Sequence, residues 1–124
     1  TQTAAVGFAG YVSGASALTE EYDGTSWTNG NNMGTARYGL AGSGLQTAAI
    51  AFGGNPGGKA DTEQYDGTNW ATTADLATGR RQLGSANSSP STASLAFGGN
   101  DTAVTNVTEE FTDTVVSSTK LDVS

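Results

Sequence analysis

The chain has 124 residues, a net charge of −7 with only five basic residues, and neither cysteine nor histidine. This length allows one modest domain. The missing residue types exclude disulfides, thiolate chemistry, and the commonest general base and metal ligand. The acidic balance argues against nucleic acid as a partner, because phosphates need clustered Lys and Arg. No apolar run approaches the roughly 20 residues of a membrane-spanning helix, and we expect no membrane insertion and no cofactor.

A strand and a turn recur along the chain. The stretch TAAVGFAG, which starts at Thr3, returns as TAAIAFGG at Thr47 and as TASLAFGG at Thr92, at offsets of 44 and 45 residues. In each copy bulky and small side chains alternate, and neither set is charged. A strand with one wet face would carry polar residues there. We therefore expect strands buried on both faces, with the bulky face of one unit packed on the small face of the next.

The rest of each copy predicts three more strands. In the middle copy Gly53-Gly54 signals a turn, after which TEQY runs into Asp66-Gly67, a strong hairpin signal, and Trp70 opens the outer strand. TEEYDGTSWT, which starts at Thr19, repeats this arrangement. The stretches RYGLAGSGL and RQLGSANSS are expected to form the inner strands of the units that follow them.

Three unequal units result, at about residues 3–46, 47–91 and 92–124 of a single partial domain, 1–124. The first lacks its opening strand and the last lacks its Trp. The period is typical of four-stranded propeller blades. One such unit cannot cover its own apolar faces, so the units must stack.

These residues resemble the kelch motif, which carries a Gly-Gly pair, a Tyr, an acidic turn and a Trp in this order. The chain is also similar to the Gly/Thr/Ala-rich kelch-like proteins of marine bacteriophages, whose units read TAALAFGG, TEEYDGTSWT and TAR. The resemblance implies an all-β fold of kelch-like β-propeller blades. It also implies a non-enzymatic virion structural protein, tail or head fibre-like, located on the virion or extracellular, that attaches to host-surface glycans.

Propellers close with about 4–8 blades, whereas this chain supplies about two and three-quarters. Its expected partners are therefore other copies of itself or other virion proteins that complete the ring. A longer polypeptide and a strand-sharing oligomer both remain open.

Recognition is expected in the loops after the glycine pairs, because these differ most between units. The loops are Tyr11–Ala17, Asn55–Ala60 and Asn100–Asn106. An assembly module without a ligand is the alternative, and a glycan-active hydrolase a third reading. The candidate ligand-binding residues are Tyr11, Asn55, Lys59, Asp61, Asn100 and Asp101.

The acidic residues could in principle form a glycosidase carboxylate pair or a calcium site. They recur once per unit at matching positions, which favours solvated strand edges and turn caps, and no catalytic or metal residue is predicted. The set comprises Glu20, Glu21, Asp23, Asp61, Glu63, Asp66, Glu109 and Glu110.

Two further residue types recur at an offset of 43. Arg37 and Arg80 are expected to bond backbone carbonyls or a carboxylate such as Glu63, using the planar fork of the guanidinium. Ligand contact is the alternative. Trp27 and Trp70 are expected to be packing residues, with stacking on sugar rings as the alternative.

Overall fold

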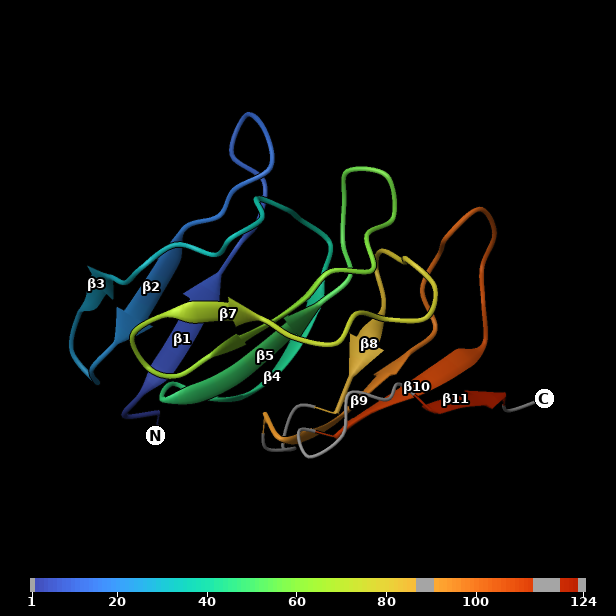
Figure 1. Ribbon diagram of the computed structural model, residues 1–124. Helices are drawn as coiled ribbons and strands as arrows, with labels where there is room; N and C mark the ends of the chain where they lie inside the picture. The colour runs from blue at the N-terminus through green and yellow to red at the C-terminus, as the bar shows by residue number, and fades with distance from the viewer. Residues whose placement is uncertain (1, 87–90, 113–118, 123–124) are drawn as a thin grey trace.

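The computed structural model describes residues 2–86, 91–112 and 119–122, the last four by their backbone alone (Figure 1). In these ranges the fold is all-β, as predicted, and consists of three small antiparallel sheets. The strands are β1 (Ala5–Phe8), β2 (Thr19–Tyr22), β3 (Trp27–Asn29), β4 (Ala41–Leu45), β5 (Ala48–Phe52), β6 (Thr62–Tyr65), β7 (Trp70–Thr72), β8 (Gly84–Ser85), β9 (Ala93–Phe97), β10 (Val107–Thr112) and β11 (Thr119–Asp122).

Each sheet is formed by strands that are consecutive in the chain. The first sheet has the order β1-β2-β3, the second β4-β5-β6-β7 and the third β8-β9-β10-β11. β4 and β8 arise from the two stretches that were expected to form inner strands, and they pair with β5 and β9 at the edges of the second and third sheets. The three sheets lie side by side and form no closed ring within the described residues (Figure 1).

The hairpins between the third and fourth strand positions form at the Asp-Gly pairs. Gly24 and Gly67 have φ values of 97° and 92°, which a glycine adopts without steric cost. Asp66 Oδ1 accepts hydrogen bonds from the backbone N–H groups of Thr68 (2.8 Å) and Asn69 (2.7 Å). Asp23 caps its turn in the same way. The predicted turn caps are therefore confirmed at both aspartates.

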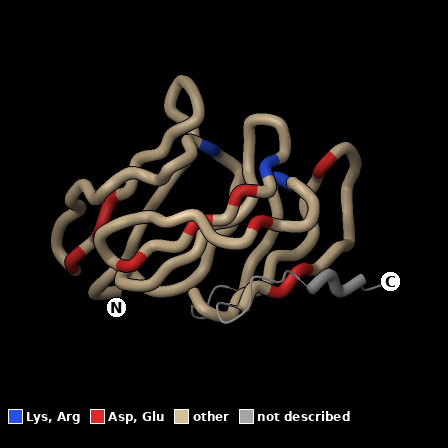
Figure 2. Tube along the Cα trace, viewed as in Figure 1, with Lys and Arg blue, Asp and Glu red and all other residues tan. Residues whose placement is uncertain are grey.

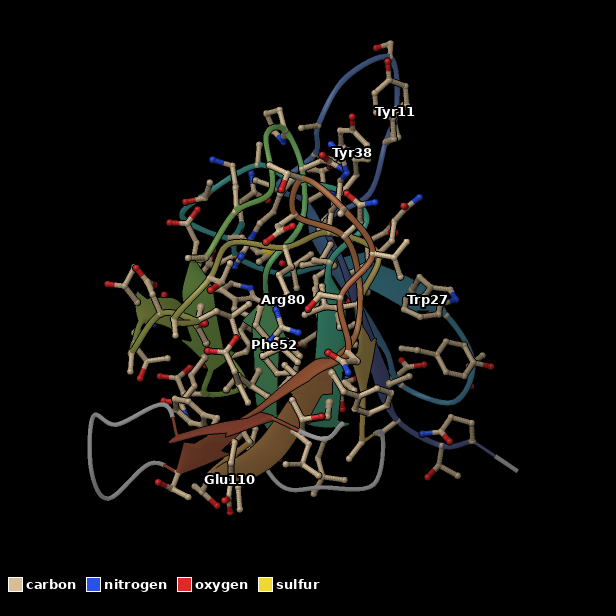
Figure 3. All side chains as sticks on the ribbon, turned by 90° about the vertical axis from the view of Figure 1, so that its right-hand side faces the viewer. Tyr11, Trp27, Tyr38, Phe52, Arg80 and Glu110 are labelled. Atoms are coloured by element: carbon tan, nitrogen blue, oxygen red, sulfur yellow. The ribbon has the colours of Figure 1, made fainter. Side chains whose placement is uncertain are left out.

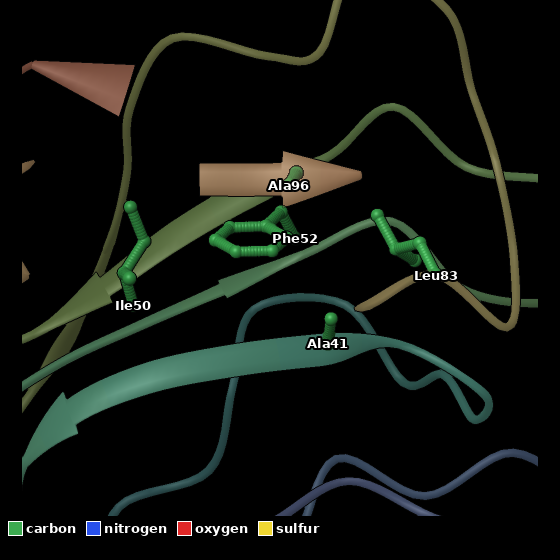
Figure 4. Packing of buried hydrophobic residues seen from close by; sticks show 5 residues of the cluster. All are labelled: Ala41, Ile50, Phe52, Leu83 and Ala96. Atoms are coloured by element: carbon green, nitrogen blue, oxygen red, sulfur yellow. The ribbon is translucent and has the colours of Figure 1, made fainter. Parts of the chain in front are cut away.

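The core lies between the second and third sheets (Figure 4). Ile50 and Phe52 project from the bulky face of β5 and are 0% and 1% exposed. Ala96, on the small face of β9, packs against them, and Leu83 closes the cluster. Burial of each large side chain stabilises the fold by about 1.5–3 kcal/mol. The expected packing of a bulky face on a small one is confirmed here.

The first and second sheets meet in the same manner. A Cβ atom on Gly42 would lie 2.6 Å from the ring of Phe8, so only glycine permits this approach. The rings of Phe8 and Trp70 meet edge-on, with their centroids 4.9 Å apart. Trp70 Nε1 also donates to Thr19 Oγ1 over 2.9 Å. The predicted packing role of Trp70 is therefore confirmed, and the structure adds that it packs between two sheets.

The prediction of strands buried on both faces is correct for β5 but wrong for β9. Leu95 and Phe97 remain 37% and 43% exposed, whereas Ser94 and Ala96 on the opposite face of β9 are buried. The bulky face of β9 lies on the outer side of the stack. Trp27, at the other end of the stack, is 53% exposed for the same reason. Its ring packs on Tyr22 of its own sheet, with 5.2 Å between the ring centroids, and not between two sheets as Trp70 does.

Candidate functional site

Three loops extend from the same end of the three sheets (Figure 1). They leave β1, β5 and β9 and rejoin the sheets at β2, β6 and β10. Each begins with two successive residues in the left-handed region, where an L side chain is strained. The φ values are 64° and 112° at Ala9 and Gly10, 72° and 110° at Gly53 and Gly54, and 65° and 93° at Gly98 and Gly99.

A buried arginine holds the base of the second loop. Arg37 lies in the segment that enters β4 and is 0% exposed. Its Nη1 donates to the carbonyl oxygens of Gly53 (2.9 Å) and Asp61, on the two sides of the loop base. Its Nη2 donates to Glu63 Oε2 over 2.8 Å. The backbone N–H of Gly34 donates to the other carboxylate oxygen over 2.6 Å.

Arg80 repeats this arrangement under the third loop. Its Nη1 donates to the carbonyl oxygens of Gly98 and Val107, both at 2.8 Å, and its Nη2 pairs with Glu109 Oε2. The backbone N–H of Ala77 donates to Glu109 Oε1 over 2.5 Å. Both arginines therefore join the chain segment between two sheets to the loop base of the next sheet. Figure 3 shows Arg80 in the interior, next to Phe52.

These ion pairs confirm the predicted bonding of Arg37 to carbonyls and to Glu63. They also correct the expectation that the acidic residues are solvated, because Glu63 and Glu109 are 1% and 2% exposed. Burial lowers the pKa of Arg37, and the Glu63 carboxylate opposes that effect. An arginine keeps its charge under such burial, because its ordinary pKa lies far above neutral pH.

A second layer of contacts lies above the arginines. Tyr38 follows Arg37 directly and meets Tyr11 edge-on, with ring centroids 5.0 Å apart (Figure 3). Arg81, the residue that matches Tyr38, donates to Asn55 Oδ1 over 3.2 Å. Each contact joins the first residue of a loop to the segment that enters the following sheet.

The predicted ligand-binding residues lie in different environments. Tyr11 is 65% exposed at the loop-bearing end, whereas Asn55 is only 7% exposed and is held by Arg81. Lys59 and Asp61 form a partly exposed ion pair at 3.7 Å. Asn100 and Asp101 lie in the third loop, at its base and near its tip.

Asp101 shapes its own loop. Its carboxylate accepts hydrogen bonds from the backbone N–H groups of Thr102 and Ala103, the second at 3.1 Å. These hydrogen bonds lower the pKa of Asp101 below 3.8, and the bond from Ala103 has the larger effect. This side chain therefore stabilises the loop and carries a negative charge at neutral pH.

Several surface residues of this end were not among the predicted site residues. Val12, at the tip of the first loop, is 74% exposed, and Val104, opposite Asn100 in the third loop, is 87% exposed. Tyr38 and Arg81 support the loops, and their place directly after the repeated arginine was a signal that could have identified them. Among the residues coloured by charge in Figure 2, the basic positions gather near this end, whereas the acidic positions are spread over the sheets.

The described residues contain no group of three or more Asp, Glu, His or Cys side chains that could hold a metal ion. In the same part of the chain no helix is long and apolar enough to cross a membrane. No protein-family model matches the sequence, and a search of curated proteins finds no similar chain.

Proposed function

We propose that the chain is part of a kelch-like β-propeller in a non-enzymatic bacteriophage virion protein, tail or head fibre-like. Its role is to present the three loops for attachment to host-surface glycans, on the virion and outside the cell. The three sheets are the blades of this propeller, and the loops lie on one of its rims.

One observation carries this proposal: three loops of different sequence extend from the same end of a repeated frame. All three loop bases share a backbone hydrogen bond, which runs from Ala9 to Leu18, from Gly53 to Asp61 and from Gly98 to Val107. Under the second and third loops Arg37 and Arg80 also make the same three types of hydrogen bond. The loops vary in length and in side chains. A rigid scaffold with variable loops is typical of recognition modules. Exposed Tyr11 provides an aromatic ring with a polar hydroxyl, a side chain that is enriched at binding interfaces.

A purely structural assembly module is the second candidate. It is favoured by the apolar side chains at the two ends of the stack. Trp27 at one end, and Leu95 and Phe97 at the other, are each more than a third exposed. Such faces are typical of surfaces that contact another protein.

A glycan array tests the choice between these functions. We expect selective binding by the intact chain and its loss when Tyr11 and Lys59, candidate residues of two different loops, are both replaced by Ser. Asn55 must be kept, because it is buried against Arg81. A matched control replaces Thr25 and Ser26, which lie in the β2–β3 turn away from the loops. Absence of binding to any glycan would refute the recognition role and favour the assembly role.

A further inference from the structure

The edge of β1 differs from the matching edges of the other two sheets. β5 lies between β4 and β6, and β9 lies between β8 and β10. β1 pairs with β2 alone, so in the part of the chain that the structure describes the first sheet has three strands and the others four. An open strand edge offers backbone N–H and C=O groups to a further strand.

In the second sheet one continuous segment, residues 34–45, occupies this position. Its first residue donates a backbone N–H to Glu63, and its Arg37 bonds Glu63 and two carbonyl oxygens. Its last five residues form β4, which pairs with β5. Residues 77–85 do the same for the third sheet with Arg80, Glu109 and β8.

The first sheet has all the acceptors that such an arginine requires. The matching groups are the carbonyl oxygens of Ala9 and Leu18 and the carboxylate of Glu20. Their frame is preserved, since Ala9 N–H donates to Leu18 O over 2.9 Å, as Gly53 N–H does to Asp61 O over 3.0 Å. Ala9 even adopts the left-handed φ of 64° that the glycines have at this position.

Glu20 lacks the arginine that its counterparts have. It is exposed, whereas Glu63 and Glu109 are 1% and 2% exposed. Among the described residues, none donates a hydrogen bond to the Glu20 carboxylate. We call each buried arginine, with its carboxylate partner and the two carbonyl oxygens that it bonds, a clamp. The first sheet therefore has the acceptors of a clamp, and no arginine among the described residues donates to them.

A groove runs beside β1, at the position that β4 occupies beside β5 and β8 beside β9. It has a volume of about 300 Å³ and is lined by Val6, Phe8, Gly42, Ser43, Gly44 and Ala49. Between the second and third sheets the matching space is filled by β4, where Ser43 bonds the hydroxyl of Ser94. Ser94 matches Ala49 of the groove by the repeat offset of 45.

We propose that the first sheet binds an extended, arginine-bearing segment by strand addition at β1. The occupant belongs to a further repeat unit and has the form Thr-x-Arg followed by a strand of small residues. Its arginine bonds the Ala9 and Leu18 carbonyls and Glu20, and its strand pairs antiparallel with β1. The facing wall includes Gly42, Gly44 and Ala49, which carry little or no side chain, so the backbone of the added strand can approach it. This binding site is formed by β1 and the acceptors at the loop base, and it does not depend on whether the loops bind a glycan.

A synthetic peptide tests this site on the intact chain. The peptide GTARYGLAGSGL copies residues 34–45. Isothermal titration calorimetry is expected to show one peptide per chain. Replacement of the peptide arginine by alanine, or Glu20→Gln in the chain, is expected to weaken binding at least about tenfold, as loss of a charge-assisted pair does. Glu110→Gln is the matched control, since Glu110 is also exposed on a strand, and should bind like the unchanged chain.

Amide hydrogen exchange locates the peptide. New protection is expected in Ala5–Phe8, with the alanine of the AGSGL stretch opposite Phe8 and the serine opposite Val6, as in the β4–β5 register. The proposal is overturned if no binding is seen up to about 1 mM, which corresponds to about −4 kcal/mol. It is also overturned if the alanine peptide and Glu20→Gln bind as well as the originals. A dimer of the chain that blocks peptide binding would identify a second copy as the occupant and refute the proposed one.

Discussion

The substitution Glu63→Gln tests the claim that the buried clamps stabilise the fold. The Glu63 side chain is 2% exposed, and its two oxygens accept from Gly34 N–H (2.6 Å) and Arg37 Nη2 (2.8 Å). A glutamine keeps one of these acceptors and turns an NH₂ donor towards the other donor. One buried donor then lacks a partner, which costs about 1–3 kcal/mol. The Arg37 guanidinium also loses its counter-charge, and removal of one partner of a buried pair costs about 3–5 kcal/mol in total.

Urea unfolding monitored by circular dichroism measures this loss. A decrease of 3 kcal/mol in the free energy of unfolding lowers the midpoint by about 1–3 M, for an m-value of about 1–3 kcal/mol/M. Glu20→Gln is the matched control, because Glu20 has the same strand position and is exposed. Its effect should stay within about 0.5 kcal/mol. If the two substitutions differ by less than about 1 kcal/mol, the clamp does not stabilise the fold as argued.

Three other predictions concern the core, a tyrosine and a turn. Phe52→Ala should lower the free energy of unfolding by about 3–5 kcal/mol, whereas Phe97→Ala, at a site 43% exposed, should cost clearly less; equal losses in urea would contradict the packing described. The pKa of Tyr65 is raised from 10.0 to about 12, mainly by burial and also by the hydrogen bond to Glu21. The stability that this raised pKa contributes is therefore complete below pH 10 and is lost as the pH rises towards 12. In Tyr65→Phe the free energy of unfolding, measured as a function of pH, should no longer show this decrease. Backbone N–H groups of Asn69 and Thr68 lower the pKa of Asp66 below 3.8. The turn is therefore stabilised above pH 3.8 and weakened as the pH falls through the lower folded value, and an NMR titration that finds Asp66 at or above 3.8 would refute the cap.

Most of the local structure could be predicted from the sequence, because it depends on neighbouring residues. Alternation of bulky and small residues predicts strands such as β5, and Asp66-Gly67 predicts its hairpin. The repeat also relates Arg37 to Arg80, and backbone carbonyls or a carboxylate such as Glu63 were predicted as their partners from the planar fork of the guanidinium. These features are set within a few residues or by the period itself.

Burial could not be predicted in the same way. Glu20 and Glu63 occupy matching positions with similar neighbours in the sequence, yet one is exposed and the other is 1% exposed. Among the loop residues, the buried side chain of Asn55 supports its loop, whereas Tyr11 at the matching position is 65% exposed. Whether a side chain is a clamp, a support or a contact surface depends on which segment lies beside it.

The sequence by itself therefore determined the strands, the turns and the repeated unit, since backbone preference and side-chain alternation act over short distances. Only the tertiary structure decided which faces are covered, which carboxylates are paired, and that the edge of β1 is open. These properties arise where segments more than twenty residues apart meet, as Arg37 meets Glu63. Such contacts follow from how the sheets stack, and a strand pattern is the same whether or not a neighbouring sheet lies against it.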